Sequence, residues 1–134
     1  MTRQFCFTLE DKPGGFAKIA EVLGNANINI EGVSGVTSNN NGVIRLLVNN
    51  ESQAEELFNS SGFDFTTEEV LLLNLDNRPG ALSRATAALF EENVNLFSLY
   101  LTMNGDEVIQ PDNVEKARSV LSKLGCLKNT PTRT

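Results

Sequence analysis

The chain has 134 residues, enough for one ordinary domain or for two very small ones, and carries a formal net charge of −6. A composition that is 40% hydrophobic and 21% charged is typical of a soluble globular protein and excludes a disordered chain. The acidic balance argues against nucleic acid as a partner, and no apolar run approaches the roughly 18 residues that a membrane span requires.

The residue types that are missing argue against metal binding, redox chemistry and acid/base catalysis by histidine. Histidine, the commonest general base and metal ligand, does not occur at all. Cys6 and Cys126 lie at opposite ends of the chain without metal or redox spacing, so we expect two buried free thiols. The first ten residues contain no signal-peptide core. Together these features predict a cytoplasmic protein without a metal site or cofactor.

The first half begins with alternating apolar residues at 3–9, which predict a half-buried strand. Pro13 then suits the first turn of a helix, which we expect to end at the asparagines of 25–27. A strand at 28–37, an NNNG hairpin turn and a returning strand at 43–48 follow. A second helix and a closing strand at 63–66 complete this half. The two apolar helix stripes are Phe16, Ile19, Ala20 and Leu23, and then Ala54, Leu57 and Phe58.

The second half repeats this order. An apolar strand at 70–75 leads to Pro79 and a helix, then to strands at 94–103 and 106–110 around an Asn-Gly turn. The final stretch, 126–128, has little to build a last strand, so we expect a sheet edge that a second chain or a partner covers. The apolar helix stripes are Leu82, Ala85, Leu89 and Phe90, and then Val114, Ala117, Leu121 and Leu124.

The two halves are an internal duplication. The segment EDKPGGFAK at 10–18 returns as DNRPGALSR at 76–84, an offset of 66 that becomes 63 after the hairpin turn. Each half therefore predicts one ferredoxin-like β-α-β-β-α-β unit, an α+β fold with an antiparallel sheet and helices on one face. We place the units at 1–68 and 69–134. The matched identities include Leu9/Leu75, Pro13/Pro79, Gly14/Gly80, Leu23/Leu89, Asn27/Asn93, Asn29/Asn95, Gly42/Gly105 and Asn50/Asn113.

This fold hosts several functions, so the residues of the site must decide among them. An RNA binder of this kind needs exposed aromatic residues and basic charge, and a metal carrier needs a loop with paired cysteines. The sequence disfavours both. An enzyme needs a nucleophile or an acid/base pair in a cleft, and the carboxylates fall mainly on predicted surface faces. Catalysis is therefore the weaker alternative.

The repeated turn has the chemistry of a site for a small zwitterion. The first turn of a helix leaves backbone N–H groups unpaired and carries partial positive charge, which suits a carboxylate. Asp11 or Asn77, just before Pro-Gly, offers an acceptor for an ammonium group. Carboxylate and ammonium together describe a free amino acid. The structural alternative is that Asp11 and Asn77 only cap the helices and that Pro-Gly only sets the turn. Asn29 and Asn95, each between apolar strand residues, favour the pocket.

The pattern strand–[Asp/Asn]-[Lys/Arg]-Pro-Gly–helix, followed by Asn-[Ile/Val]-Asn-[Ile/Leu], resembles the ACT domain family. Two copies span nearly the whole chain, which looks like the stand-alone tandem ACT proteins. The resemblance implies a non-catalytic regulator that binds an amino acid where sheets lie side by side. It also implies a homodimer that acts in trans on an enzyme of amino-acid metabolism. The alternative is an assembly or scaffold module with vestigial ligand sites.

Carried over by position, the resemblance implies ligand contacts in both halves. The backbone of the turn would hold the carboxylate, Asp11 or Asn77 the ammonium, and the strand asparagine the rest of the ligand. Leu75 stands where serine-sensing members have histidine, which weakens the case for serine. Because Asp11 is charged and Asn77 is not, the two sites need not be equivalent. The implied residues are Asp11, Gly14, Gly15, Phe16 and Asn29, and then Asn77, Gly80, Ala81, Leu82 and Asn95.

Overall fold

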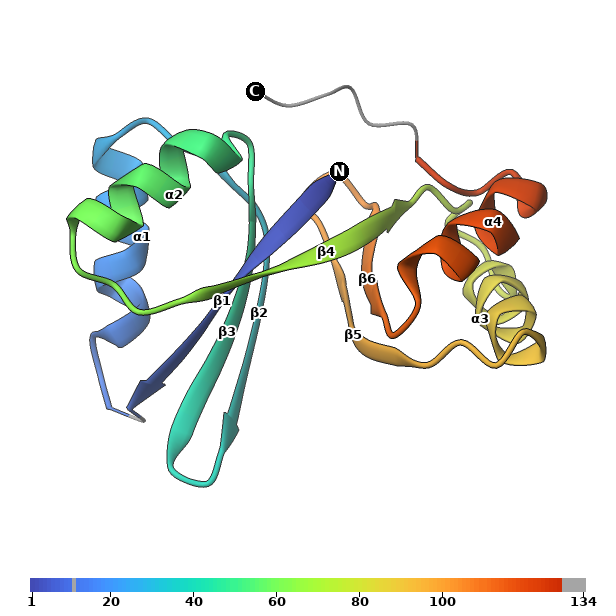
Figure 1. Ribbon diagram of the computed structural model, residues 1–134, viewed down its shortest axis with the longest axis horizontal. Helices are drawn as coiled ribbons and strands as arrows, with labels where there is room; N and C mark the ends of the chain where they lie inside the picture. Colours follow the sequence, from blue (N-terminus) through green and yellow to red (C-terminus); the bar gives the residue numbers. More distant parts are fainter. Residues whose placement is uncertain (11, 129–134) are drawn as a thin grey trace. The chain divides into compact units, whose positions relative to one another are not determined.

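The computed structural model describes residues 1–10 and 12–128, which form six strands and four helices (Figure 1). Their order confirms the predicted α+β fold with a duplicated β-α-β-β-α-β pattern. Within these residues, no helix is both long and apolar enough to cross a bilayer. In chain order the elements are β1 Thr2–Glu10, α1 Gly15–Asn25, β2 Ile30–Ser38, β3 Asn41–Val48, α2 Glu51–Ser60, β4 Thr66–Leu73, α3 Ala81–Glu91, β5 Leu96–Leu101, β6 Glu107–Pro111 and α4 Val114–Leu124.

The chain folds into two compact units whose boundary falls inside β4, between Glu68 and Glu69. In the first unit β3 lies between β2 and β1, and in the second β6 lies between β5 and β4. All of these pairings are antiparallel. Each unit keeps both of its helices on one face of its own strands (Figure 1).

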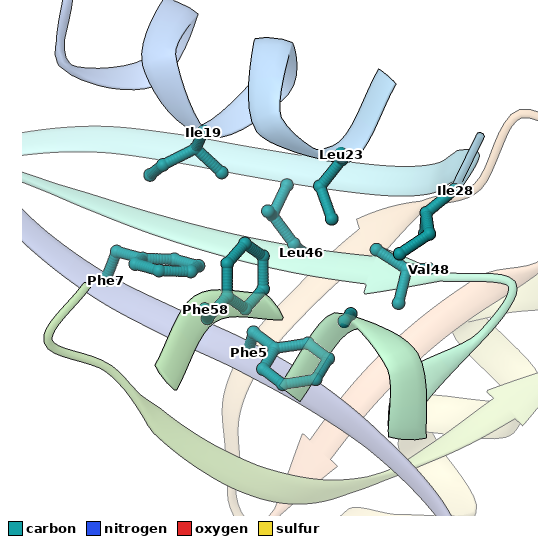
Figure 2. Packing of buried hydrophobic residues seen from close by; sticks show 9 residues of the cluster. Phe5, Phe7, Ile19, Leu23, Ile28, Leu46, Val48 and Phe58 are labelled. Atoms are coloured by element: carbon teal, nitrogen blue, oxygen red, sulfur yellow. The ribbon is translucent and has the colours of Figure 1, made fainter. Parts of the chain in front are cut away.

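The core of the first unit is built around phenylalanine. Figure 2 shows Phe5 and Phe7 of β1 beside Phe58 of α2, with Ile19 and Leu23 of α1 closing the cluster. The Phe58 ring lies edge-on to both strand rings, at centroid distances of 5.3 and 5.0 Å. Edge-to-face rings at this spacing add to the free energy of burial. These residues are fully buried, so the predicted apolar stripes of α1 and α2 do face the sheet.

The second unit has an aliphatic core at the equivalent place. Its buried members come from both helices, from β4 and β6, and from the segments that flank them. An ion pair also links a helix to the sheet in this unit: Arg118 of α4 lies 2.8 Å from Glu69 of β4. The buried members are Leu71, Leu73, Ala85, Leu89, Val94, Ile109, Ala117, Leu121 and Cys126.

Several repeated asparagines have a structural role. Asn27 and Asn93 follow α1 and α3 with φ of 58° each, the left-handed conformation that asparagine tolerates better than most residues. Asn50 and Asn113 cap α2 and α4, because their side-chain oxygens accept from the N–H three residues later, at 3.1 Å in both cases. The duplication thus preserved residues that begin and end helices.

Three sequence predictions were wrong in detail. The expected strands at 63–66 and 70–75 are one continuous strand, β4, while Phe63 and Phe65 pack on the first core from the preceding loop. Pro13 and Pro79 precede the helices instead of lying in their first turn, because the N-cap residues are the glycines that follow them. Phe90, placed on the apolar stripe of α3, is 80% exposed.

The last described residues of the second unit, 126–128, form no extended strand. Leu127 makes a single antiparallel bridge with Leu73. Lys128 N–H donates to the Leu72 carbonyl at 2.9 Å, and Asn74 N–H donates to the Cys126 carbonyl at 2.8 Å. The prediction that residues 126–128 have little to build a strand is therefore confirmed, because a single β-bridge forms there.

Candidate functional site

Both strand-to-helix turns are built by the same hydrogen bonds. Lys12 N–H donates to the Glu10 carbonyl at 2.8 Å, and Arg78 N–H donates to the Asp76 carbonyl at 2.9 Å. The side chains of the same residues also pair, Lys12 with Glu10 at 3.2 Å and Arg78 with Asp76 at 3.6 Å. The duplication therefore extends from the sequence to the hydrogen bonds of the turn.

The glycine of each Pro-Gly pair is required by its backbone conformation. Gly14 has a φ of +99° and Gly80 a φ of +91°, a region that side chains with a Cβ rarely adopt. Nothing lies within 4 Å of where a Cβ would stand at either residue. The turn therefore needs glycine for φ, and the space outside it is open.

The N-terminus of α3 has no side-chain cap. Its first helical hydrogen bond runs from Arg84 N–H to the Gly80 carbonyl at 3.0 Å, so the amides of Leu82 and Ser83 lie before the hydrogen-bonded ladder. Of the three amides expected to hold a carboxylate, that of Ala81 donates to the Arg78 carbonyl at 3.3 Å. The Asn77 side chain does not cap α3, so the capping role considered for this residue is not observed.

A pocket of about 270 Å³ opens beside this turn, within the second unit. Asn77, Ala81 and Leu82, all predicted from the sequence, line it. Its other wall comes from the β5–β6 hairpin, through Leu101, Gly105 and Glu107. Leu75, Asp76 and Arg78 complete the lining. The structure thus joins the turn to a hairpin that is more than twenty residues away in sequence.

Glu107 is the site residue that the sequence prediction missed. Its Oε2 atom is buried and has no hydrogen-bond partner among the described residues. Burial raises the pKa of the Glu107 carboxyl above its ordinary value; a hydrogen bond from the backbone of Glu107 itself acts against this shift, and the neighbouring charge of Asp106 adds to it. The repeat carried a signal, because the offset of 63 sets this acid against the apolar Ile44.

In the first half, the predicted residues lie in the corresponding turn. Gly14 caps α1, Gly15 opens it, and Phe16 is half-buried against the first core. A Cβ on Gly15 would stand 3.3 Å from Leu9 Cδ1, so this residue packs tightly on the end of β1. Asp11 lies outside the described residues.

The strand asparagines lie at the far end of the sheet from their own turns. Asn95 N–H donates to Asp112 Oδ1 at 3.0 Å, and Asp112 N–H returns a bond to the Asn95 carbonyl at 2.9 Å. Asn29 and Asn49 make the same pair at 3.0 and 3.1 Å. At about 3.3 Å per residue, β5 separates Asn95 from Leu101 by roughly 20 Å. Asn95 therefore cannot reach the turn pocket of its own unit.

The remaining groups offer weaker chemistry. A second pocket, of about 420 Å³, is lined by Arg118 and Lys128, but both cations already pair with carboxylates, Arg118 with Glu69 and Lys128 with Asp106. Burial raises the pKa of the Cys6 and Cys126 thiols, so neither is activated as a nucleophile. The described residues contain no cluster of three or more potential metal ligands.

Comparison with known proteins identifies related chains. The family model for an ACT domain pair matches residues 1–129. Protein BT0572 of Bacteroides thetaiotaomicron has a similar structure, with 27% identity and a TM-score of 0.87 over 95% of this chain and 91% of that one. The ligand-free regulatory subunit of aspartate kinase from Thermus thermophilus follows at 14% identity and a TM-score of 0.66, over 92% of this chain and 89% of that one. No curated protein matches the sequence.

Proposed function

Because this chain belongs to the ACT domain family, as an ACT domain pair, we propose that it is a regulator that binds a free amino acid. The observation that supports this function is the pocket beside the uncapped N-terminus of α3. Backbone amides and the helix dipole favour a carboxylate there. Polar and apolar side chains share the remaining wall, as expected of a small-molecule site.

We assign the ligand contacts on the residues that line this pocket and on the turn that borders it. The backbone amides of the turn at Gly80 and Leu82 hold the carboxylate, and Asn77, which lines the pocket, meets a polar group of the ligand. The equivalent groups of the first half are Gly14, Gly15, Phe16 and Asp11. Asn95, which is remote from its own turn, contributes only where it faces the turn of a second copy of the chain. Asn29 is in the same situation.

Regulation in trans is the second part of the proposal. The similar aspartate kinase chain is named as a regulatory subunit, which supports a role beside a metabolic enzyme. We propose that two copies of the chain assemble into a homodimer, and that the protein acts in the cytoplasm, where its two free thiols remain reduced. No cofactor or catalytic step is part of this function.

One observation favours an assembly module as the second candidate. β5 is an edge strand of its sheet, and three of its side chains are exposed although they are apolar. Exposed apolar edges are typical of interaction sites. The exposed fractions are 60% for Phe97, 42% for Leu99 and 63% for Leu101. An interface here is compatible with ligand binding, so only ligand binding itself separates the two candidates.

The test is a thermal-shift screen of the full chain against the twenty common L-amino acids. A ligand at 100 times its dissociation constant stabilises the folded state by about 2.7 kcal/mol. We expect one or a few related amino acids to raise the melting temperature at millimolar concentration. If none does so, the chain is not an amino-acid sensor, and the assembly module becomes the better proposal.

A further inference from the structure

Besides the residues of the turn, the two halves differ at a strand position of the site, and strand register identifies it. In the first unit Phe7 of β1 pairs with Ile44 of β3, and in the second Leu73 of β4 pairs with Glu107 of β6. Phe7 and Leu73 are related by the offset of 66, so Ile44 and Glu107 occupy the same place in their sheets. The third strand agrees, because Ile44 pairs with Gly35 and Glu107 with Leu101.

This place has opposite chemistry in the two halves. Ile44 packs against the first hydrophobic core, and its Cδ1 would lie 3.1 Å from a Cβ built on Gly35. Glu107 instead lines the turn pocket and keeps Oε2 buried without a donor. A buried, unpaired carboxylate oxygen costs folding free energy, so packing alone does not account for an acid here.

The other charges of the pocket do not satisfy Glu107. Asp76 and Arg78 pair with each other across the turn, at 3.6 Å between Arg78 Nε and Asp76 Oδ2. Asp106, the neighbour in sequence, is paired with Lys128. Glu107 therefore supplies the uncompensated negative charge of the lining, opposite the partial positive charge of the α3 N-terminus. A pocket with a negative charge on one side and a partial positive charge on the other suits a zwitterion, a ligand that carries both an amine and a carboxylate.

We propose that Glu107 of β6, and not Asn77 of the turn, receives the protonated amine of the ligand in the second half. This inference rests on the proposed function and assigns a specificity-determining residue to it. In sequence, the acid Asp11 of the first turn corresponds to the amide Asn77, and the acid Glu107 on the strand corresponds to Ile44. The acid that would meet an amine therefore stands at different sequence positions in the two halves, so the two sites need not select the same ligand.

The test compares E107Q with the full wild-type chain in the same screen of twenty amino acids, with dissociation constants from calorimetry at neutral pH. Glutamine keeps the shape and removes the charge. Loss of one charge-assisted hydrogen bond predicts binding weaker by about tenfold or more. E92Q is the matched control, because Glu92 is exposed and lies at the opposite end of α3, roughly 16 Å away at 1.5 Å per residue. E92Q should bind as the wild type does.

The pattern of losses identifies the source of the amine. If E107Q weakens every amino acid that binds, Glu107 receives the α-ammonium group. If only L-lysine and L-arginine lose affinity, it receives a side-chain cation, and L-norleucine, which lacks the side-chain amine of lysine, should then be insensitive to E107Q. Either pattern supports the inference. Unchanged affinities in E107Q overturn it while leaving the sensor intact, whereas a wild type that binds no amino acid overturns both proposals.

A second measurement does not depend on any variant. The ¹³C resonance of the Glu107 carboxyl reports its titration in the wild-type chain. An amine beside the carboxylate favours the charged form, so saturating ligand should lower the pKa of Glu107. A pKa that stays the same when the bound amino acid is added contradicts the assignment.

Discussion

Removal of the Glu107 charge should stabilise the second unit while it weakens ligand binding. The relevant free energy is that of unfolding without ligand. An unpaired charged group costs more to bury than an unpaired neutral one, and glutamine removes the charge while it keeps a polar group. Because the Glu107 side chain is only half-buried, we expect E107Q to gain about 1 kcal/mol at neutral pH. For a unit of this size, that gain raises the melting temperature by about 4–8 °C.

The gain should depend on pH with a defined sign. Burial raises the pKa of Glu107 in the folded state above its value in the unfolded chain, which is about 4.3. Between those two values the folded state binds more protons, so wild-type stability falls as pH rises through this window. E107Q lacks the titration. The difference between the two proteins should therefore be small below pH 4 and largest above the folded-state pKa.

Urea unfolding from pH 4 to 8 measures this difference. The chain has one tyrosine and no tryptophan, and Tyr100 is a buried residue of β5, so tyrosine fluorescence reports on the second unit. E92Q, which removes an equal charge from an exposed site, should show no such pH dependence. An E107Q protein that is less stable than the wild type at pH 7, or a difference that is constant with pH, would refute the account of Glu107 as a buried, unpaired acid.

Three further substitutions, each paired with a control variant, test the structure. Gly80→Ala should lower the free energy of unfolding by about 1–2 kcal/mol, because alanine is strained at a φ of +91°. Gly24→Ala, inside α1 where φ is ordinary, should raise the free energy of unfolding by about 0.5–1 kcal/mol. Asn113→Ala should lower the free energy of unfolding in urea by about 0.5–2 kcal/mol, because the α4 cap is lost. Serine also caps helices, so an equal loss in Asn113→Ser would show that the cap hydrogen bond is unimportant. Phe58→Ala should lower the free energy of unfolding, followed by circular dichroism, by about 3–5 kcal/mol, because four phenylalanine rings contact Phe58. Phe90→Ala should change it very little, because Phe90 is 80% exposed. Comparable losses in the two variants would contradict the placement of Phe58 in the core.

The structure also bears on why the duplicated turn diverged. The two halves differ in which positions near the turn carry an acid, because Asp11 before the first Pro-Gly corresponds to Asn77, whereas Glu107 beside the second turn corresponds to Ile44. In the first unit the strand position is occupied by Ile44, which packs on the phenylalanine core. In the second unit the same position lines a pocket instead.

The amino-acid sequence by itself determined the repeated elements, because their signals are local. Turn glycines, capping asparagines and apolar periods act within a few residues, so Asn27, Asn93 and the helix stripes could be predicted without tertiary contacts. It also located the Pro-Gly turn as the candidate site. Phe90 was misplaced because periodicity describes one helix face and not what covers it.

Only the tertiary structure decided which residues complete the pocket. Glu107 and Leu101 reach the turn through antiparallel register, which joins residues more than twenty positions apart and has no local signature. Register also places Asn95 at the opposite end of β5, a separation that sequence spacing does not reveal. The physical reason is that a helix cap depends on its neighbours along the chain, whereas the charge inside a pocket depends on which strands pair.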